Sequence, residues 1–155
     1  MKIKGKDLYE PLLFGENMLS TSSTTFRKSV IDKVGMFDED KEKCHFAEDY
    51  DLWLRIAKKN CTFYFTNEIL GEYIEHDTNY SQNLGRMLRS ETYVLLKHFK
   101  YFEKKTPYYI YLMAKRMVIL YLRTFKKWVS RPKHALRHTM FAPKALYPKN
   151  RGDTP

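Results

Sequence analysis

Two stretches decide the predicted fold of this 155-residue sequence: VGMFDE at residues 34–39 and AEDYDLWLR at residues 47–55. In the second stretch, apolar residues recur at the spacing of a helical turn, which predicts a helix over residues 47–59. Acidic residues occupy its first turn and lysines its last, and this order complements the helix dipole. We therefore expect a charged loop over residues 36–46 that leads into the acidic end of a helix.

The other elements are predicted from similar local patterns. They are a short helix within 7–19, a strand over 20–26, a short helix over 27–34 ended by Gly35, strands over 61–66 and 69–75, and helices over about 82–104 and 107–129. This mixture predicts an α/β protein in three parts. The parts are an α/β region over 1–82, a basic helical extension over 83–130 and a loose basic tail over 131–155.

Charge divides the chain into two unlike halves. Residues 1–81 hold 11 Lys and Arg against 15 Asp and Glu, a net charge of −4, whereas residues 82–155 hold 17 against 3, a net charge of +14. Such asymmetry suggests two roles. The basic half is expected to bind an anionic membrane surface. Nucleic acid is the less favoured partner, because no nucleic-acid motif accompanies the charge.

Cysteines and the N-terminus exclude some classes of protein. Cys44 and Cys61 form neither a CxxC motif nor a cluster with histidine, so two free thiols in a reducing compartment are expected. No apolar run follows the lysine-rich residues 1–6, so neither a signal peptide nor a membrane span is expected in that segment.

Three motifs in the same order resemble the family 2 glycosyltransferases, which have the GT-A fold. GMFDE at 35–39 with EDYDLWLR at 48–55 resembles the pattern GxFDE … xEDxDLxxR. SSTTFRK at 22–28 resembles the small-residue strand that leads into an RR or RK helix. YIEHDTNYS at 73–81 resembles YRxHxxNxS, with Ile74 in place of the usual arginine. The resemblance implies the C-terminal, acceptor-side half of a Rossmann-like GT-A domain.

The resemblance also implies a reaction. The family transfers a sugar from a nucleotide sugar to an acceptor hydroxyl of a polysaccharide or lipid-linked glycan, with inversion in this case. Inversion requires a base that takes the acceptor proton. By resemblance, Asp49 is that base, and its neighbour Glu48 contacts the acceptor or a loop, while His76 contacts the metal or the diphosphate. The alternatives are that these acids serve only the helix dipole and that His76 is a hydrogen-bonded surface residue.

The complete enzyme is expected to use Mg²⁺ or Mn²⁺ held by a DxD motif. The strings at 38–40 and 49–51 do not fit that role, because the first lies within GxFDE and the second on a predicted helix, where positions i and i+2 diverge. We therefore expect this chain alone to be inactive, and a separate chain that carries the nucleotide-binding half is a candidate partner. The alternative function is a non-catalytic basic module that binds a membrane or a partner.

Two aromatic residues of the predicted helix over 47–59 are candidates for stacking on an acceptor sugar, Tyr50 and Trp53. At helical spacing such residues more often belong to the core, and this is the favoured role for Trp53. Arg55 is expected to pair with Asp51 four residues earlier.

The helix predicted over 107–129 is amphipathic. At 100° per residue, an arc of about 120° holds its five cations, which are Lys115, Arg116, Arg123, Lys126 and Lys127. Aromatic and aliphatic residues occupy most of the rest, a pattern typical of helices on a membrane surface. Two of the cations interrupt the apolar run, so a spanning helix is not expected. The alternative is packing on the chain's own domain with the cations in solvent. The predicted location is cytoplasmic and peripheral, on the inner face of the membrane.

Overall fold

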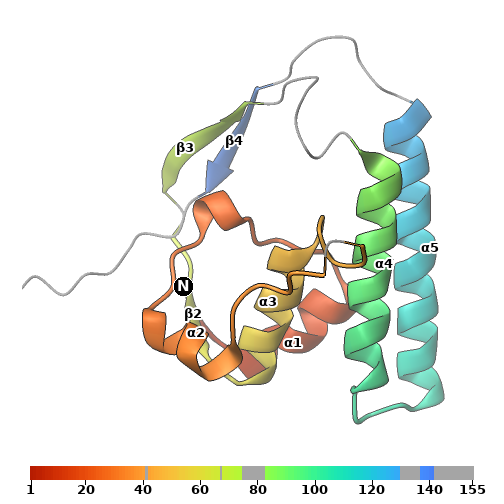
Figure 1. Ribbon diagram of the computed structural model, residues 1–155, viewed down its shortest axis with the longest axis horizontal. Coiled ribbons are helices and arrows are strands. Elements are labelled where there is room, and N and C mark those ends of the chain that lie inside the picture. Colours follow the sequence, from red (N-terminus) through yellow and green to blue (C-terminus); the bar gives the residue numbers. More distant parts are fainter. Residues whose placement is uncertain (41, 67, 75–82, 130–136, 142–155) are drawn as a thin grey trace, which may run out of the picture.

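The computed structural model describes residues 1–40, 42–66, 68–74, 83–129 and 137–141. Its elements in chain order are β1 (Lys2–Lys4), α1 (Gly5–Phe14), the 3-10 turn η1 (Thr21–Ser23), α2 (Lys28–Val34), α3 (Glu48–Lys58), β2 (Thr62–Tyr64), β3 (Ile69–Ile74), α4 (Leu84–Lys100), α5 (Pro107–Val129) and β4 (Arg137–Phe141). Figure 1 shows α3 near the centre and the pair α4 and α5 side by side along one edge.

The strands form two separate antiparallel pairs. In the first pair Lys2 lies opposite Tyr64, and in the second Ile74 lies opposite Arg137. The chain combines helices with small antiparallel sheets, which is consistent with a general α/β class. No parallel pair of strands occurs within the described ranges. The Rossmann-like sheet that the resemblance implies is therefore not observed there.

The core is built around α3, which packs against α1, α2 and α4. Three consecutive residues of α3, Leu52, Trp53 and Leu54, are fully buried, so neighbours cover this helix on most sides. Leu12 and Leu13 of α1 and Val94 and Leu95 of α4 complete the centre. The acidic first turn therefore begins a helix that is buried and packed against α1, α2 and α4.

Residues with positive φ end both α2 and α3. Gly35 ends α2 with φ +84°, a conformation that side chains rarely adopt, as the sequence predicted. At the far end of α3, Asn60 has φ +55°, and the N–H groups of Asn60 and Cys61 donate to Ala57 and Ile56 in a Schellman motif. A Cβ on Gly5 would lie 2.6 Å from the Ala57 carbonyl oxygen, so α1 begins in close contact with the end of α3.

Two expectations differ from the structure. The predicted strand over 20–26 is instead the turn η1, because the hydroxyls of Ser23 and Thr24 donate to the Ser20 carbonyl and compete with strand pairing. In the tail predicted to be loose, Arg137–Phe141 form β4, whose backbone pairs with β3. The other residues of the tail, 131–136 and 142–155, lie outside the described residues.

Candidate functional site

Asp49 lies in the first turn of α3, facing η1. Its Oδ2 accepts a hydrogen bond of 2.8 Å from the Thr21 hydroxyl, and its Oδ1 accepts one of 2.6 Å from the Tyr50 N–H. The side chain is half-buried. The two contacts fix the carboxylate at the helix N-terminus, where the dipole favours a negative charge. A hydroxyl therefore already occupies the position from which a base would take a proton.

Glu48 differs from Asp49 in its surroundings. Its Oε2 is buried and finds no hydrogen-bond partner among the described residues. Burial raises the pKa of Glu48, and the charge of the adjacent Asp49 adds to the rise. The first turn of α3 therefore presents two carboxyl groups in unlike environments: Asp49 accepts a hydrogen bond from the Thr21 side chain, whereas burial raises the pKa of Glu48.

Asp51 is fully buried and serves the fold. Its Oδ1 accepts from Lys97 Nζ at 2.9 Å and from His98 Nε2 at 3.0 Å, and its Oδ2 accepts from Arg55 Nε at 2.8 Å. Burial alone would raise the pKa of Asp51, but the hydrogen bonds from His98, Lys97 and Arg55 hold it well below its usual value. The Arg55 pair confirms the prediction from i,i+4 spacing. The two contacts with α4 have no signal in the sequence, because their partners lie about 47 residues away.

Arg55 and Lys97 join the two motif segments. The Arg55 guanidinium donates to the carbonyls of Val34 and Met36, each at 2.7 Å. Lys97 also donates to Asp38 at 2.8 Å. The loop over 34–38 is therefore held against α3 and α4 by charge-assisted hydrogen bonds. The GMFDE and EDYDLWLR motifs form a single structural unit.

Tyr50 and Trp53 both lie in the core. Trp53 is fully buried and makes an edge contact with Phe26, while the Tyr50 hydroxyl donates to the Leu12 carbonyl at 2.5 Å. Burial raises the pKa of Tyr50. Neither ring offers a free face to a sugar, so the structure favours the core role over acceptor stacking for both residues.

The expected metal contact cannot be placed, since His76 lies outside the described residues. In the part of the chain that the structure describes, no group of three or more His, Cys, Asp or Glu is arranged to hold a metal ion. Both cysteines are free thiols, as predicted. Burial raises the pKa of Cys44 to about 12, which keeps this thiol protonated and unreactive.

The five cations of α5 do not share one environment. Arg116 is 1% exposed, and its Nη2 donates to Glu91 of α4 at 2.6 Å. Its expected membrane-surface role is therefore wrong, because its guanidinium is enclosed between the two helices. Arg123 forms an ion pair of 3.1 Å with Glu16. Lys115, Lys126 and Lys127 are exposed, which is compatible with a surface role.

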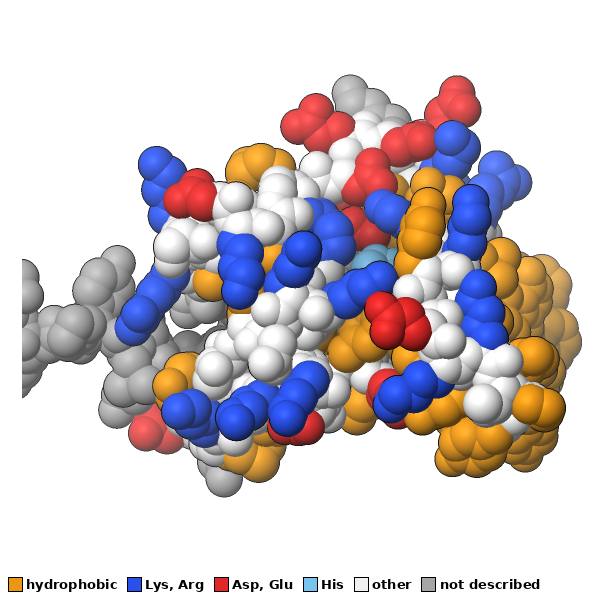
Figure 2. Space-filling model, turned by 90° about the horizontal axis from the view of Figure 1, so that it is seen from below, with side chains coloured by type: hydrophobic (Ala, Val, Ile, Leu, Met, Phe, Trp, Pro, Cys, Tyr) orange, Lys and Arg blue, Asp and Glu red, His pale blue; other side chains and the backbone are white. Residues whose placement is uncertain are grey.

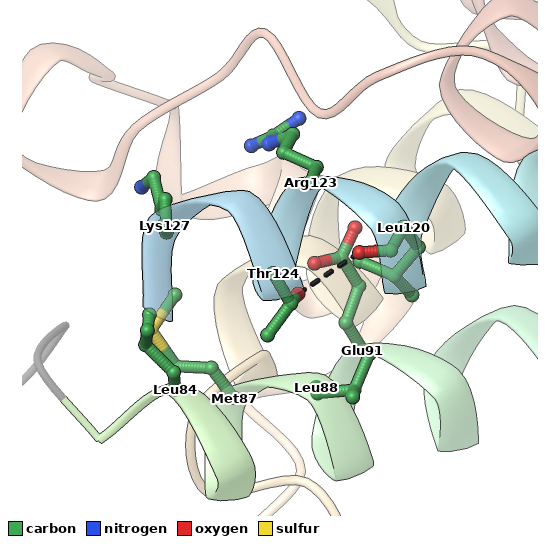
Figure 3. Close-up of a pocket in the computed structure, with 8 residues that line it drawn as sticks. All are labelled: Leu84, Met87, Leu88, Glu91, Leu120, Arg123, Thr124 and Lys127. Carbon is green, nitrogen blue, oxygen red and sulfur yellow. Dashed lines mark hydrogen bonds between the residues drawn. The ribbon is translucent and has the colours of Figure 1, made fainter. Parts of the chain in front are cut away.

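A small hollow lies between α4 and α5 (Figure 3). Glu91 of α4 points toward α5 there, and Thr124 donates to the Leu120 carbonyl at 2.9 Å. Its volume is about 30 Å³, which is room for one water molecule. The hollow is therefore too small for a sugar.

Within the described residues, no helix is both long and apolar enough to cross a lipid bilayer. Comparisons with known proteins give no further assignment: no family model matches the chain, and neither a curated protein nor a solved structure is significantly similar to it.

Proposed function

We propose that this chain supplies the acceptor-side, C-terminal part of a family 2 glycosyltransferase with the GT-A fold. One observation carries the proposal: the two motif segments, apart in sequence, are bound to each other by Arg55 and Lys97. This union supports treating them as one functional unit. It also supports a catalytic role for the carboxylates that the unit holds at the start of α3.

The proposed reaction is inverting sugar transfer from a nucleotide sugar to an acceptor hydroxyl. The acceptor hydroxyl takes the place of the Thr21 hydroxyl beside Asp49 Oδ2. As the acceptor oxygen attacks the anomeric carbon, Asp49 takes its proton, and the nucleotide diphosphate departs with the electron pair of the broken bond. Glu48 lines the same helix end and contacts the acceptor. The divalent ion expected for the complete enzyme has no ligand set among the described residues.

The test is genetic rescue in the source cells. Disruption of the gene is expected to remove a glycan component from the cell envelope, measured by carbohydrate composition analysis. The unaltered gene and Asp32→Asn, an exposed control on α2, restore that component, whereas Asp49→Asn does not. Full rescue by Asp49→Asn at equal protein level would refute the assignment of the base. An unchanged glycan profile after disruption would refute the transferase proposal itself.

A second function, non-catalytic attachment to a membrane or a partner, is favoured by one separate observation. The helix α5 exposes most of its large apolar side chains to solvent. The proposed location, peripheral on the inner face of the cytoplasmic membrane, fits either function.

A further inference from the structure

The helix α5 carries an apolar surface on the side that faces away from the rest of the protein. At 100° per residue, its members fall within an arc of about 120° that contains no charge. Each of them is between 52% and 64% exposed. We call this surface the outward face, and it comprises Tyr111, Val118, Tyr121, Leu122, Phe125 and Trp128.

The orientation of α5 explains why this face is exposed. The opposite side packs inward through Met113, Arg116 and Leu120, which are all buried. Figure 2 shows hydrophobic side chains gathered along the edge of the molecule that α5 forms in Figure 1. The cationic arc is partly enclosed, since Arg116 is buried, and the apolar arc is presented to the outside. A patch of this kind on a single helix marks a binding surface.

We propose that the outward face of α5 binds the surface of an anionic lipid bilayer, with the helix lying flat in the headgroup region. Tyrosine and tryptophan suit that depth, because their rings are apolar and their O–H or N–H groups reach water. At 1.5 Å per residue, the 23 residues of α5 extend for about 34 Å along the membrane plane.

Charge favours a membrane over other occupants of the face. Residues 104–129 contain seven Lys and Arg and no Asp or Glu. Lys115 and Lys126 follow one edge of the outward face and are exposed, so they meet lipid phosphates when the face is buried. A second copy of this chain would instead bring the same lysines together without an acidic partner from α5, and like charges across a symmetric interface are repulsive.

This inference is independent of glycosyl transfer, since none of its residues belongs to the first turn of α3. Binding of the purified full chain is measured by flotation with two kinds of vesicle, pure phosphatidylcholine and a 70:30 mixture with phosphatidylserine. We expect binding to the anionic vesicles that weakens as salt is added, and much weaker binding to the neutral ones. Equal binding to both vesicles, or none to either, overturns the proposal.

Matched variants locate the surface. Leu122→Ser combined with Phe125→Ser is expected to lower the partition coefficient between vesicles and water at least tenfold. The reason is that two apolar side chains expected to enter the lipid are replaced by polar ones. The control is Met18→Ser with Met36→Ser, two residues that are equally exposed but lie outside α5. Lys115→Ala is expected to cost about fivefold, whereas Lys28→Ala on α2 costs little. Equal losses in variants and controls would refute the assigned face.

The two tryptophans supply an internal probe of depth. Trp128 is 64% exposed on the outward face, whereas Trp53 is fully buried in the core. Lipids brominated on their acyl chains are expected to quench fluorescence in the unaltered chain and to lose this effect in Trp128→Phe. Light scattering after size-exclusion chromatography tests the rival occupant. A dimer that Leu122→Ser with Phe125→Ser dissociates, without any vesicle binding, would assign the face to a second copy and overturn the proposal.

Discussion

The acidic first turn of α3 and the outward face of α5 behave in opposite ways. In α3, a charged cluster is largely committed inside the molecule: Asp51 has three partners, and Asp49 is held by Thr21. In α5, large apolar side chains remain exposed to solvent. Residue type alone therefore predicts neither burial nor availability. What decides is whether another element supplies a partner.

The largest expected effect is that of removing the charge of Asp51. Asp51→Asn leaves Lys97 and Arg55 without their buried counter-charge, so the free energy of unfolding should fall by about 3–5 kcal/mol. Urea denaturation followed by circular dichroism measures it. Asp49→Asn is the matched control and should cost less than about 1 kcal/mol. Similar losses in the two variants would mean that Asp51 is no more structural than its neighbour.

The next effect separates two adjacent cations of α5. Arg116→Ala leaves Glu91 without its partner between the helices. The free energy of unfolding is expected to fall by about 3 kcal/mol, measured by urea denaturation. Lys115→Ala, one residue earlier and exposed, should change stability by less than about 0.5 kcal/mol. If both variants were equally stable, the enclosed position of Arg116 would be wrong.

A smaller effect is the loss of the Asp51 network in acid. Because the folded-state pKa of Asp51 is lowered, its stabilisation is present above its unfolded pKa of about 3.9 and is lost as the pH falls toward the folded value. The stability difference between the unaltered chain and Asp51→Asn should therefore shrink below about pH 4. Denaturation curves between pH 7 and pH 2.5 measure this, and a constant difference would contradict it.

The smallest effect is expected on the outward face. Without lipid, Leu122→Ser with Phe125→Ser should change the free energy of unfolding by no more than about 0.5 kcal/mol, because both side chains are already exposed. Leu120→Ser, on the buried side of the same helix, should cost at least about 2 kcal/mol. A large loss in the outward variant would show that this face packs against the protein itself.

Sequence reasoning performed best where the governing interactions are local. The helix predicted over 107–129 is observed with those bounds, and the one predicted over 47–59 is one residue shorter at each end. Gly35 and the pair between Asp51 and Arg55 were also predicted, since each depends on neighbours within four residues. The prediction of a strand over 20–26 was wrong, although the interactions that decide this segment are also local. Serine and threonine suit a strand by composition, but here their hydroxyl groups bond the nearby backbone and form a turn.

The candidate site could be predicted only in part. The position of Asp49 and Glu48 in the first turn of α3 followed from the helix pattern and the acidic residues before it. The contact between Thr21 and Asp49 and the bond from the Tyr50 hydroxyl to Leu12 did not, because they join residues that are 28 and 38 positions apart. Composition also gave no sign that Lys97 reaches both Asp38 and Asp51.

The sequence by itself determined that α5 is a long helix with one cationic and one apolar arc, because the 3.6-residue repeat depends only on the chain. Only the tertiary structure decided which arc faces inward. A buried guanidinium is tolerated where a carboxylate meets it, and Glu91 on α4 does so for Arg116 across 25 residues of sequence. That contact, together with the packing of Met113 and Leu120, turns the apolar arc to the outside.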